Sequence, residues 1–340
     1  MAIRLPARAS PPDGAAAIPP RRRLLGALGA LALARAAGAQ APAAASPIRL
    51  IVPAPAGGSG DRLARIVAEA LAGILEVPVD VENVPGNGGV TGTNAIASGP
   101  ADGSVLGIVA NSAIVGGRLL SRSARFNPGE DFEWLAILGS YPNAMVVSAR
   151  SGQRTLGGWL AAARLAAPPL TYASFGPGSA GHLAGAYLRQ EKGAHLVHRT
   201  LDALDEGYAQ LSDGTLDVLF DGVPNALVEA RASGHPIVAV TSEGRVDALP
   251  DAPSFGELWR ESFVVWLGLV APKRLDAAAY LRLAAAVGVL LSEPRHAAAM
   301  RAAGATYIGL SGRGTTAFVD REFLRIAKLI ARLNDEGVRD

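Results

Sequence analysis

The sequence contains no cysteine among its 340 residues. Disulfide frameworks, thiolate metal sites and cysteine nucleophiles are therefore excluded, and the absence suits an oxidising compartment. Aromatic residues are also scarce, at 5% of the chain. The remaining composition, 49% hydrophobic and rich in alanine, leucine, valine and glycine, is typical of a globular protein and leaves room for two lobes of ordinary size.

A large net charge is missing as well. The formal charge is +2, yet residues 1–39 hold six arginines against a single acid, Asp13. The rest of the chain has 26 basic and 29 acidic residues, a net charge of −3. Because the basic character belongs to the first 39 residues, the remainder shows no basic footprint of the kind that binds nucleic acid.

Residues 1–39 have the three parts of a secretory signal peptide. Arginines at 21–23 precede an apolar run at 24–34, and small residues follow at 37–41. This run of about 11 residues is too short to cross a bilayer, which takes roughly 20; a buried helix is the alternative interpretation. We expect export to the periplasm, and the pair Arg21 and Arg22 hints at the twin-arginine route.

Beyond residue 40, short apolar runs alternate with helical patterns, which predicts an α/β fold with largely parallel sheets. Strands are expected at 48–52, 77–84, 105–110, 135–138, 144–149, 170–174, 195–200, 216–220, 236–240 and 263–271. The segment after residue 276 is expected to be mostly helical and to pack back on the first lobe.

Two strand–glycine loop–helix units lie about 120 residues apart, which indicates two similar lobes. Loops at the carboxyl ends of their strands would face a shared cleft. We place the first lobe at 40–147 plus 262–340 and the second at 148–261.

The first glycine loop, "PAPAGGSGD", joins a strand to a helix that begins near residues 59–61. Its glycines allow close approach to a ligand, and the first helical N–H groups form a seat for an anion. A phosphate loop is excluded because no lysine follows, and Leu63 occupies the last glycine position of a dinucleotide fingerprint. Asp61 in the first turn would tolerate a carboxylate with a donor group, or it simply stabilises the helix start.

The second loop, "YASFGPGSAGHLAGAYL", repeats this arrangement. Ser174 ends a strand, Gly176 and Gly178 free the backbone, and Ser179 is a good N-cap, with a hydroxyl that could also face the cleft. "PGSAG" differs from a nucleophile elbow because Pro177 replaces the first glycine. A serine hydrolase using Ser179, His198 and Asp217 stays open as an alternative, and a dinucleotide-dependent enzyme is the other rival.

Two further motifs carry weaker signals. His195 and His198 lie three apart on an expected strand and so point to opposite faces, which disfavours a metal pair. "PGNGG" at 85–89 is equally consistent with a tight turn and with a ligand contact.

Several segments taken together resemble the tripartite tricarboxylate transporter solute-receptor family, also called Bug receptors. They are "IRLIVPAPAGGSGDRLARIVAEALAGIL", "VPVDVENVPGNGGVTGTNAIASGPADG", "YASFGPGSAGHLAG", "DGTLDVLFDGV", "LPDAPSFGEL" and "WLGLVAP". The resemblance covers about residues 48–333, in the family's order. It implies a two-lobed periplasmic-binding-protein-like fold that closes around a small solute, usually a carboxylate, without catalysis, cofactor or metal.

In that family two loops hold the carboxylate through backbone amides, small hydroxyls and waters. Carried over to this chain, the implied ligand-binding residues are Ala56, Gly57, Gly58, Ser59, Gly60, Asp61, Ser174, Gly176, Gly178, Ser179 and His182. Asn111, Ser112 and Asp221, which lie just past expected strands, are further candidates at the cleft edge. The implied partner is an integral membrane permease pair or a sensor protein, and a monomer is expected.

The chain departs from the family's pattern in the cleft region. Ala54 stands where an aromatic residue is usual, Gly60 where threonine is common, and Leu201 and Asp202 where the family has tyrosine and lysine. These changes would widen the pocket or remove polar contacts.

Overall fold

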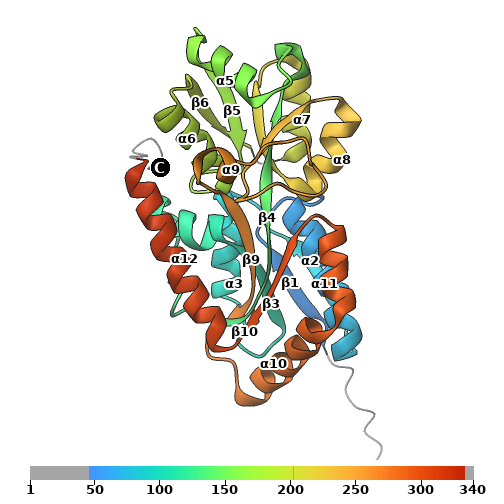
Figure 1. The fold of residues 1–340 in the computed structure, drawn as a ribbon. Coiled ribbons are helices and arrows are strands. Elements are labelled where there is room, and N and C mark those ends of the chain that lie inside the picture. The colour runs from blue at the N-terminus through green and yellow to red at the C-terminus, as the bar shows by residue number, and fades with distance from the viewer. Residues whose placement is uncertain (1–45, 202, 334–340) are drawn as a thin grey trace, which may run out of the picture. The chain divides into compact units, whose positions relative to one another are not determined.

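The computed structural model describes residues 46–201 and 203–333, in which ten strands form one continuous, curled sheet flanked by helices (Figure 1). The predicted signal peptide and Asp202 lie outside the described residues. In the described part of the chain no single helix has the length and apolar composition of a membrane span; α10 and α11 meet that criterion only jointly, as a pair bent by 68°.

The strands are β1 Ile48–Val52, β2 Val79–Asn83, β3 Val105–Ala110, β4 Phe132–Val147, β5 Leu170–Ser174, β6 Leu196–Thr200, β7 Val218–Gly222, β8 Ile237–Val240, β9 Val264–Pro272 and β10 Thr306–Ser311. The α-helices are α2 Ser59–Leu75, α3 Val90–Ala97, α4 Arg118–Leu120, α5 Leu156–Leu165, α6 Ala180–Lys192, α7 Leu204–Asp213, α8 Val223–Ser233, α9 Phe255–Trp259, α10 Ala277–Ser292, α11 Pro294–Ala302 and α12 Arg313–Arg332. Short turns of other helix types are η1 Asn87–Gly89, η2 Ser112–Gly117 and η3 Ala149–Ser151.

The sheet has two halves that share strand β4. The first half runs β2-β1-β3-β9-β4, with β10 also paired to β4; the second runs β4-β7-β5-β6, with β8 paired to β4. Residues of β4 up to Pro142 pair with β9, and residues from Asn143 onward pair with β7. The strand therefore passes from one half to the other between Pro142 and Asn143.

The sheet is mixed, so the expectation of largely parallel sheets is only partly correct. The pairs β1–β2, β1–β3, β5–β6 and β5–β7 are parallel, whereas every pairing made by β4 or β9 is antiparallel. The strands expected at 135–138 and 144–149 belong to one strand, β4. Pro142 lacks an N–H and looks like a break in the sequence, but it lies where β4 changes from pairing with β9 to pairing with β7.

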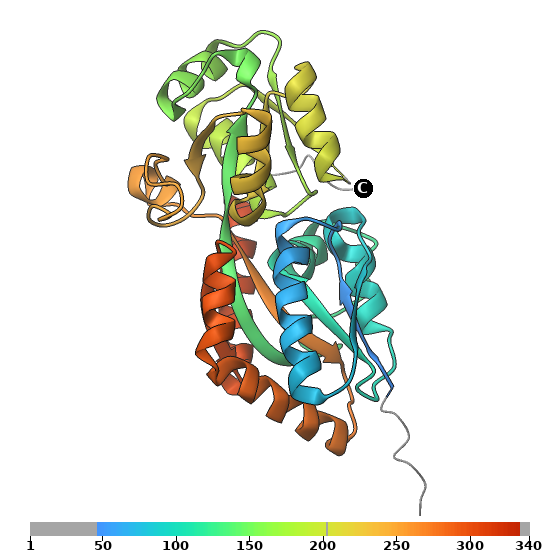
Figure 2. The same cartoon turned by 90° about the vertical axis from the view of Figure 1, so that its right-hand side faces the viewer.

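Helices cover the first half as their apolar faces predict. Helix α2 buries Leu63, Val67 and Leu71, and α10 and α11 pack against α2 (Figure 2). The C-terminal helices thus return to the half that contains β1, as expected. Strand β10 was not expected: its pattern, "TYIGLS", is half exposed and interrupted by glycine, so its periodicity is weak.

Candidate functional site

A small pocket of about 100 Å³ lies where the two halves of the sheet meet. Its walls come from the β1–α2 loop, the residues around η1, the start of η2, strand β4, the β5–α6 loop and the end of β7. Among the described residues that line it there is no lysine, arginine or histidine, and Asp221 is the single charged side chain. A solute bound here would therefore meet mostly main chain, small hydroxyls and apolar groups.

Helix α2 presents its N-terminus to this pocket. Gly58 is its N-cap residue and provides no side-chain cap, so the first helical N–H groups, on Ser59 and Gly60, have no acceptor within the helix. Both residues line the pocket. The helix dipole adds roughly half a positive charge at this end.

Asp61 supports this loop from behind rather than lining the pocket. Its carboxylate accepts hydrogen bonds from the Gly57 N–H (2.9 Å), from Arg65 (2.9 Å) and from Asn83 (3.0 Å). Burial alone would raise the pKa of Asp61, but these donors hold it below its ordinary value. With its side chain 2% exposed and fully engaged, Asp61 fixes the conformation of the glycine loop.

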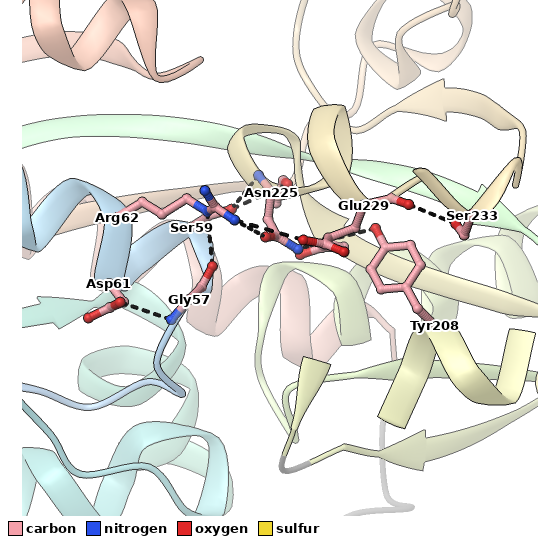
Figure 3. Close-up of polar contacts among 10 residues, drawn as sticks. Gly57, Ser59, Asp61, Arg62, Tyr208, Asn225, Glu229 and Ser233 are labelled. Carbon is pink, nitrogen blue, oxygen red and sulfur yellow. Dashed lines mark hydrogen bonds and ion pairs between the residues drawn. The ribbon is translucent and has the colours of Figure 1, made fainter. Parts of the chain in front are cut away.

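The serine hydroxyl of the first loop reaches across to the other half of the sheet. Ser59 Oγ donates to the Gly222 carbonyl (3.3 Å) and accepts from the Asn225 N–H (3.1 Å). Arg62 donates to the Asn225 side chain at 3.3 Å and to the Gly57 carbonyl at 2.9 Å (Figure 3). These bonds tie the start of α2 to the start of α8.

Helix α6 presents a second N-terminus to the same pocket. Ser179 caps it by accepting from the His182 N–H (3.2 Å), and donates to Ser174 Oγ (3.1 Å). Ser174 Oγ in turn bonds His198 Nε2 at 2.8 Å. Ser174, Ser179 and the first helical residues, Ala180 and Gly181, line the pocket.

His182 is buried and holds the second loop from within. Its Nδ1 accepts the Gly178 N–H at 3.0 Å, and burial, with the charge of Arg189 adding to it, lowers the pKa of His182 to about 4. The ring is therefore neutral near pH 7. His182 is not among the residues that line the pocket.

The glycines of the second loop touch the main chain of η1 and η2, which belong to the first half. A Cβ on Gly176 would lie 3.1 Å from the Gly88 Cα, and one on Gly178 would lie 2.5 Å from the Gly116 Cα. Both residues have positive φ, at 111° and 74°. Glycine is thus required here by backbone conformation and by the close approach of the two halves.

The three cleft-edge candidates differ in position. Ser112 lines the pocket, but Asn111 does not, and its amide donates to the Val264 carbonyl at 2.9 Å. Asp221 lines the pocket and accepts from Tyr208 (2.9 Å) and Asn225 (2.7 Å). Burial, although opposed by these hydrogen bonds, raises the pKa of Asp221 to about 6.

Half of the predicted site residues thus meet in one pocket. These are Gly58, Ser59, Gly60, Ser112, Ser174, Ser179 and Asp221. The other seven lie beside it and support the loops or pack elsewhere: Ala56, Gly57, Asp61, Asn111, Gly176, Gly178 and His182.

Sequence reasoning missed the floor of the pocket. Tyr141 and Asn143 from β4 line it, as do Leu201 and Leu204 on the far wall. Tyr141 and Asn143 are two apart on one strand and so share a face; a polar pair at this spacing inside an apolar run was the available signal. Ala54, Gly60 and Leu201, three of the noted departures, line the pocket, and Gly86, Gly88 and Gly89 of "PGNGG" contribute to it.

The serine hydrolase alternative is not supported by this geometry. Ser179 Oγ bonds another serine and caps its helix, and the serine in contact with His198 is Ser174. The Asp217 carboxylate accepts from the N–H and hydroxyl of Thr171, at 2.7 and 3.1 Å. The expected order of nucleophile, base and acid is therefore not assembled.

Comparison with known proteins agrees with the fold. The model of the tripartite tricarboxylate transporter family receptor matches residues 63–335. BugT of Bordetella pertussis is 28% identical over 289 residues, which span 84% of this chain and 89% of BugT.

Two solved structures share the fold. The periplasmic binding protein BugD has a TM-score of 0.78 at 24% identity and covers 86% of this chain and 98% of its own. The R. palustris protein Rpa4515, solved with adipate, has a TM-score of 0.80 at 22% identity and covers 85% and 98%.

The family match confirms the resemblance seen in the sequence, the two-lobed α/β fold of periplasmic binding proteins and a receptor role without catalysis. Receptors of this family are periplasmic, bind small carboxylates and work with a membrane transporter. The chain belongs to the family of tripartite tricarboxylate transporter receptors.

Proposed function

We propose that this receptor holds the carboxylate of a small solute in the pocket between the two halves of its sheet. The observation that carries the proposal is the convergence of two helix N-termini, those of α2 and α6, on one pocket. Bare N–H groups and two helix dipoles favour an anion there.

Further support comes from the size of the pocket and from a structural neighbour. About 100 Å³ is of the same order as the roughly 150 Å³ cavity that takes benzene, which suits a small solute. Rpa4515 was solved with adipate, a dicarboxylate. Of the residues predicted from the sequence, the seven that line the pocket are the proposed ligand contacts.

Closure around the solute needs two lobes and a hinge. We take residues 40–147 plus 262–340 as one lobe and 148–261 as the other. The chain crosses between them in β4 and again just before β9, where Thr241 bonds both Asn143 and Phe263: Thr241 Oγ1 donates to the Phe263 carbonyl at 2.6 Å and accepts the Asn143 N–H at 2.9 Å. These paired crossings suit a hinge motion.

The remaining parts of the proposal concern export, oligomeric state and partners. The receptor is exported by its N-terminal signal peptide, with Arg21 and Arg22 favouring the twin-arginine route. It acts as a monomer and delivers its solute to an integral membrane permease pair, or to a sensor protein.

A panel of small organic acids tests the binding function by thermal unfolding. A true ligand at 100-fold excess over its dissociation constant should raise the unfolding free energy by about 2.7 kcal/mol. Gly58→Leu should abolish the shift, because even a Cβ at Gly58 would lie 3.2 Å from Leu204 Cδ1 across the pocket. Failure of every acid to shift the transition would contradict the proposal.

The matched control is Gly73→Leu on the same helix. Gly73 has nothing within 4 Å of a Cβ, so this variant should keep the full ligand-induced shift. A ligand effect that survives Gly58→Leu would show that the solute binds elsewhere.

A further inference from the structure

Two polar side chains on the pocket floor have no hydrogen-bond partner among the described residues. Tyr141 is 8% exposed and Asn143 is 6% exposed, and both line the pocket. The hydrogen bonds of Asn143 to Thr241 are made by its main chain, and the Tyr141 hydroxyl makes no hydrogen bond to another described residue. Because both residues line the pocket, their unpaired polar ends are available to a bound molecule.

Each of the two lies next to one of the helix N-termini. A Cβ on Gly60, in the first turn of α2, would lie 3.7 Å from the Tyr141 hydroxyl; one on Gly181, in the first turn of α6, would lie 3.3 Å from the Asn143 amide nitrogen. Glycine at these positions leaves both polar groups uncovered. The floor therefore offers two neutral groups beside the proposed carboxylate seat.

The charge around the pocket limits what can sit on this floor. The helices α2 and α6 supply roughly half a positive charge each, enough for one carboxylate. Asp221 directly precedes α8, whose own N-terminus offsets its charge, and no cationic side chain lines the pocket among the described residues. A second ionised group on the solute would be left without compensation in a buried site.

We propose that Tyr141 and Asn143 form a subsite that binds an uncharged oxygen of the solute, so that the receptor prefers small monocarboxylates bearing a hydroxyl or carbonyl over dicarboxylates. This inference rests on the proposed function and names its solute class. Tyr141 donates its hydroxyl to the oxygen, and the Asn143 amide donates to it or accepts from a solute hydroxyl.

Four-carbon acids provide the test by isothermal titration calorimetry at pH 7.5. Butyrate carries the carboxylate alone; 2-, 3- and 4-hydroxybutyrate add a neutral oxygen at each position; succinate adds a second charge. At least one hydroxybutyrate should bind about fivefold more tightly than butyrate, the gain of one neutral hydrogen bond, and succinate roughly tenfold more weakly than that hydroxy acid.

The variants assign the effect to the subsite. Tyr141→Phe and Asn143→Leu should each reduce the preference for the hydroxy acid over butyrate while butyrate still binds. Tyr307→Phe is the matched control, because Tyr307 donates its hydroxyl to the Leu291 carbonyl at 2.7 Å away from the pocket, and it should keep the preference. The unliganded melting temperature and circular dichroism of each variant show that it folds.

The outcomes separate the two proposals. Equal binding of butyrate and all hydroxybutyrates, tighter binding of succinate, or an unchanged preference in Tyr141→Phe and Asn143→Leu would overturn the subsite and leave the carboxylate receptor intact. If no acid of the set binds the wild-type protein, both proposals fail together.

Discussion

The loops that precede α2 and α6 line the same pocket but are held in place by different interactions. The α2 loop is held by a charged network on its outer side, where Asp61 bonds Gly57, Arg65 and Asn83. The α6 loop is held by neutral, buried groups, Ser174, Ser179 and His182. Asp61 and His182 stabilise their loops from outside the pocket, whereas Ser174 and Ser179 line it; in both loops the main-chain N–H groups at the helix start are left for a solute.

The two loops also differ in what their strained glycines touch. Gly57 and Gly178 have nearly the same φ, 78° and 74°, so alanine is strained at either position. A Cβ on Gly57 meets nothing within 4 Å, whereas one on Gly178 meets the main chain of Gly116, in η2 of the other half. The pair therefore separates backbone strain from contact between the two halves.

The largest expected effect follows from that pair. Gly178→Ala should force the walls apart, and if the closed form falls to about one per cent, the apparent dissociation constant of a carboxylate ligand rises about 100-fold. Gly57→Ala should cost stability by strain alone and change affinity far less. Titration calorimetry of both variants measures this, and equal losses of affinity would show that closure does not depend on the Gly178–Gly116 contact.

An effect of intermediate size is the pH dependence of the stability that His182 gives the α6 loop. The pKa of His182 is lowered to about 4 by burial, followed by the charge of Arg189, so the unfolded chain takes up the proton first. The stability that the neutral ring provides is complete above pH 6.5 and is lost as the pH falls toward 4, by about 3 kcal/mol in all.

His182→Asn tests this effect, because asparagine can accept from Gly178 but does not titrate. The raised pKa of Asp221 acts with the opposite sign, since it adds stability as the pH falls through about 6, but it is common to both proteins. The difference in unfolding free energy between wild type and variant, measured by urea denaturation from pH 7.5 to 4, should therefore shrink with acid. Parallel curves would contradict the prediction.

The smallest expected difference concerns salt. Arg65→Gln removes a charge from the pair with Asp61, in which the arginine side chain is 55% exposed, and should cost about 0.5–1 kcal/mol at low ionic strength. This loss should diminish as salt screens the pair. Ser179→Ala removes a neutral cap and should cost about 1 kcal/mol at any salt concentration; equal salt dependence in the two variants would erase the distinction between the loops.

Local sequence patterns predicted the two loops, their helices and the cap at Ser179, because glycine runs, N-cap residues and helical periodicity are signals of short range. They did not reveal that the Asp61 side chain bonds its own loop instead of lining the pocket, since nothing in the sequence marks Gly57 and Asn83 as its partners. The contact between Gly178 and Gly116 depends on how the halves of the sheet meet. Tyr141 and Asn143 were missed because Pro142 divides β4 into two apparent strands.

The most direct test of the carboxylate seat observes the main-chain N–H groups themselves. In glycine-selective ¹⁵N-labelled protein titrated with the tightest-binding acid, the amide signals of Gly60 and Gly181 should both move, with one common dissociation constant. Gly73 in α2 and Gly288 in α10, with nothing within 4 Å of a Cβ, should stay in place. Saturable binding that moves neither pocket glycine, or only one of them, would contradict a carboxylate held jointly by two helix N-termini.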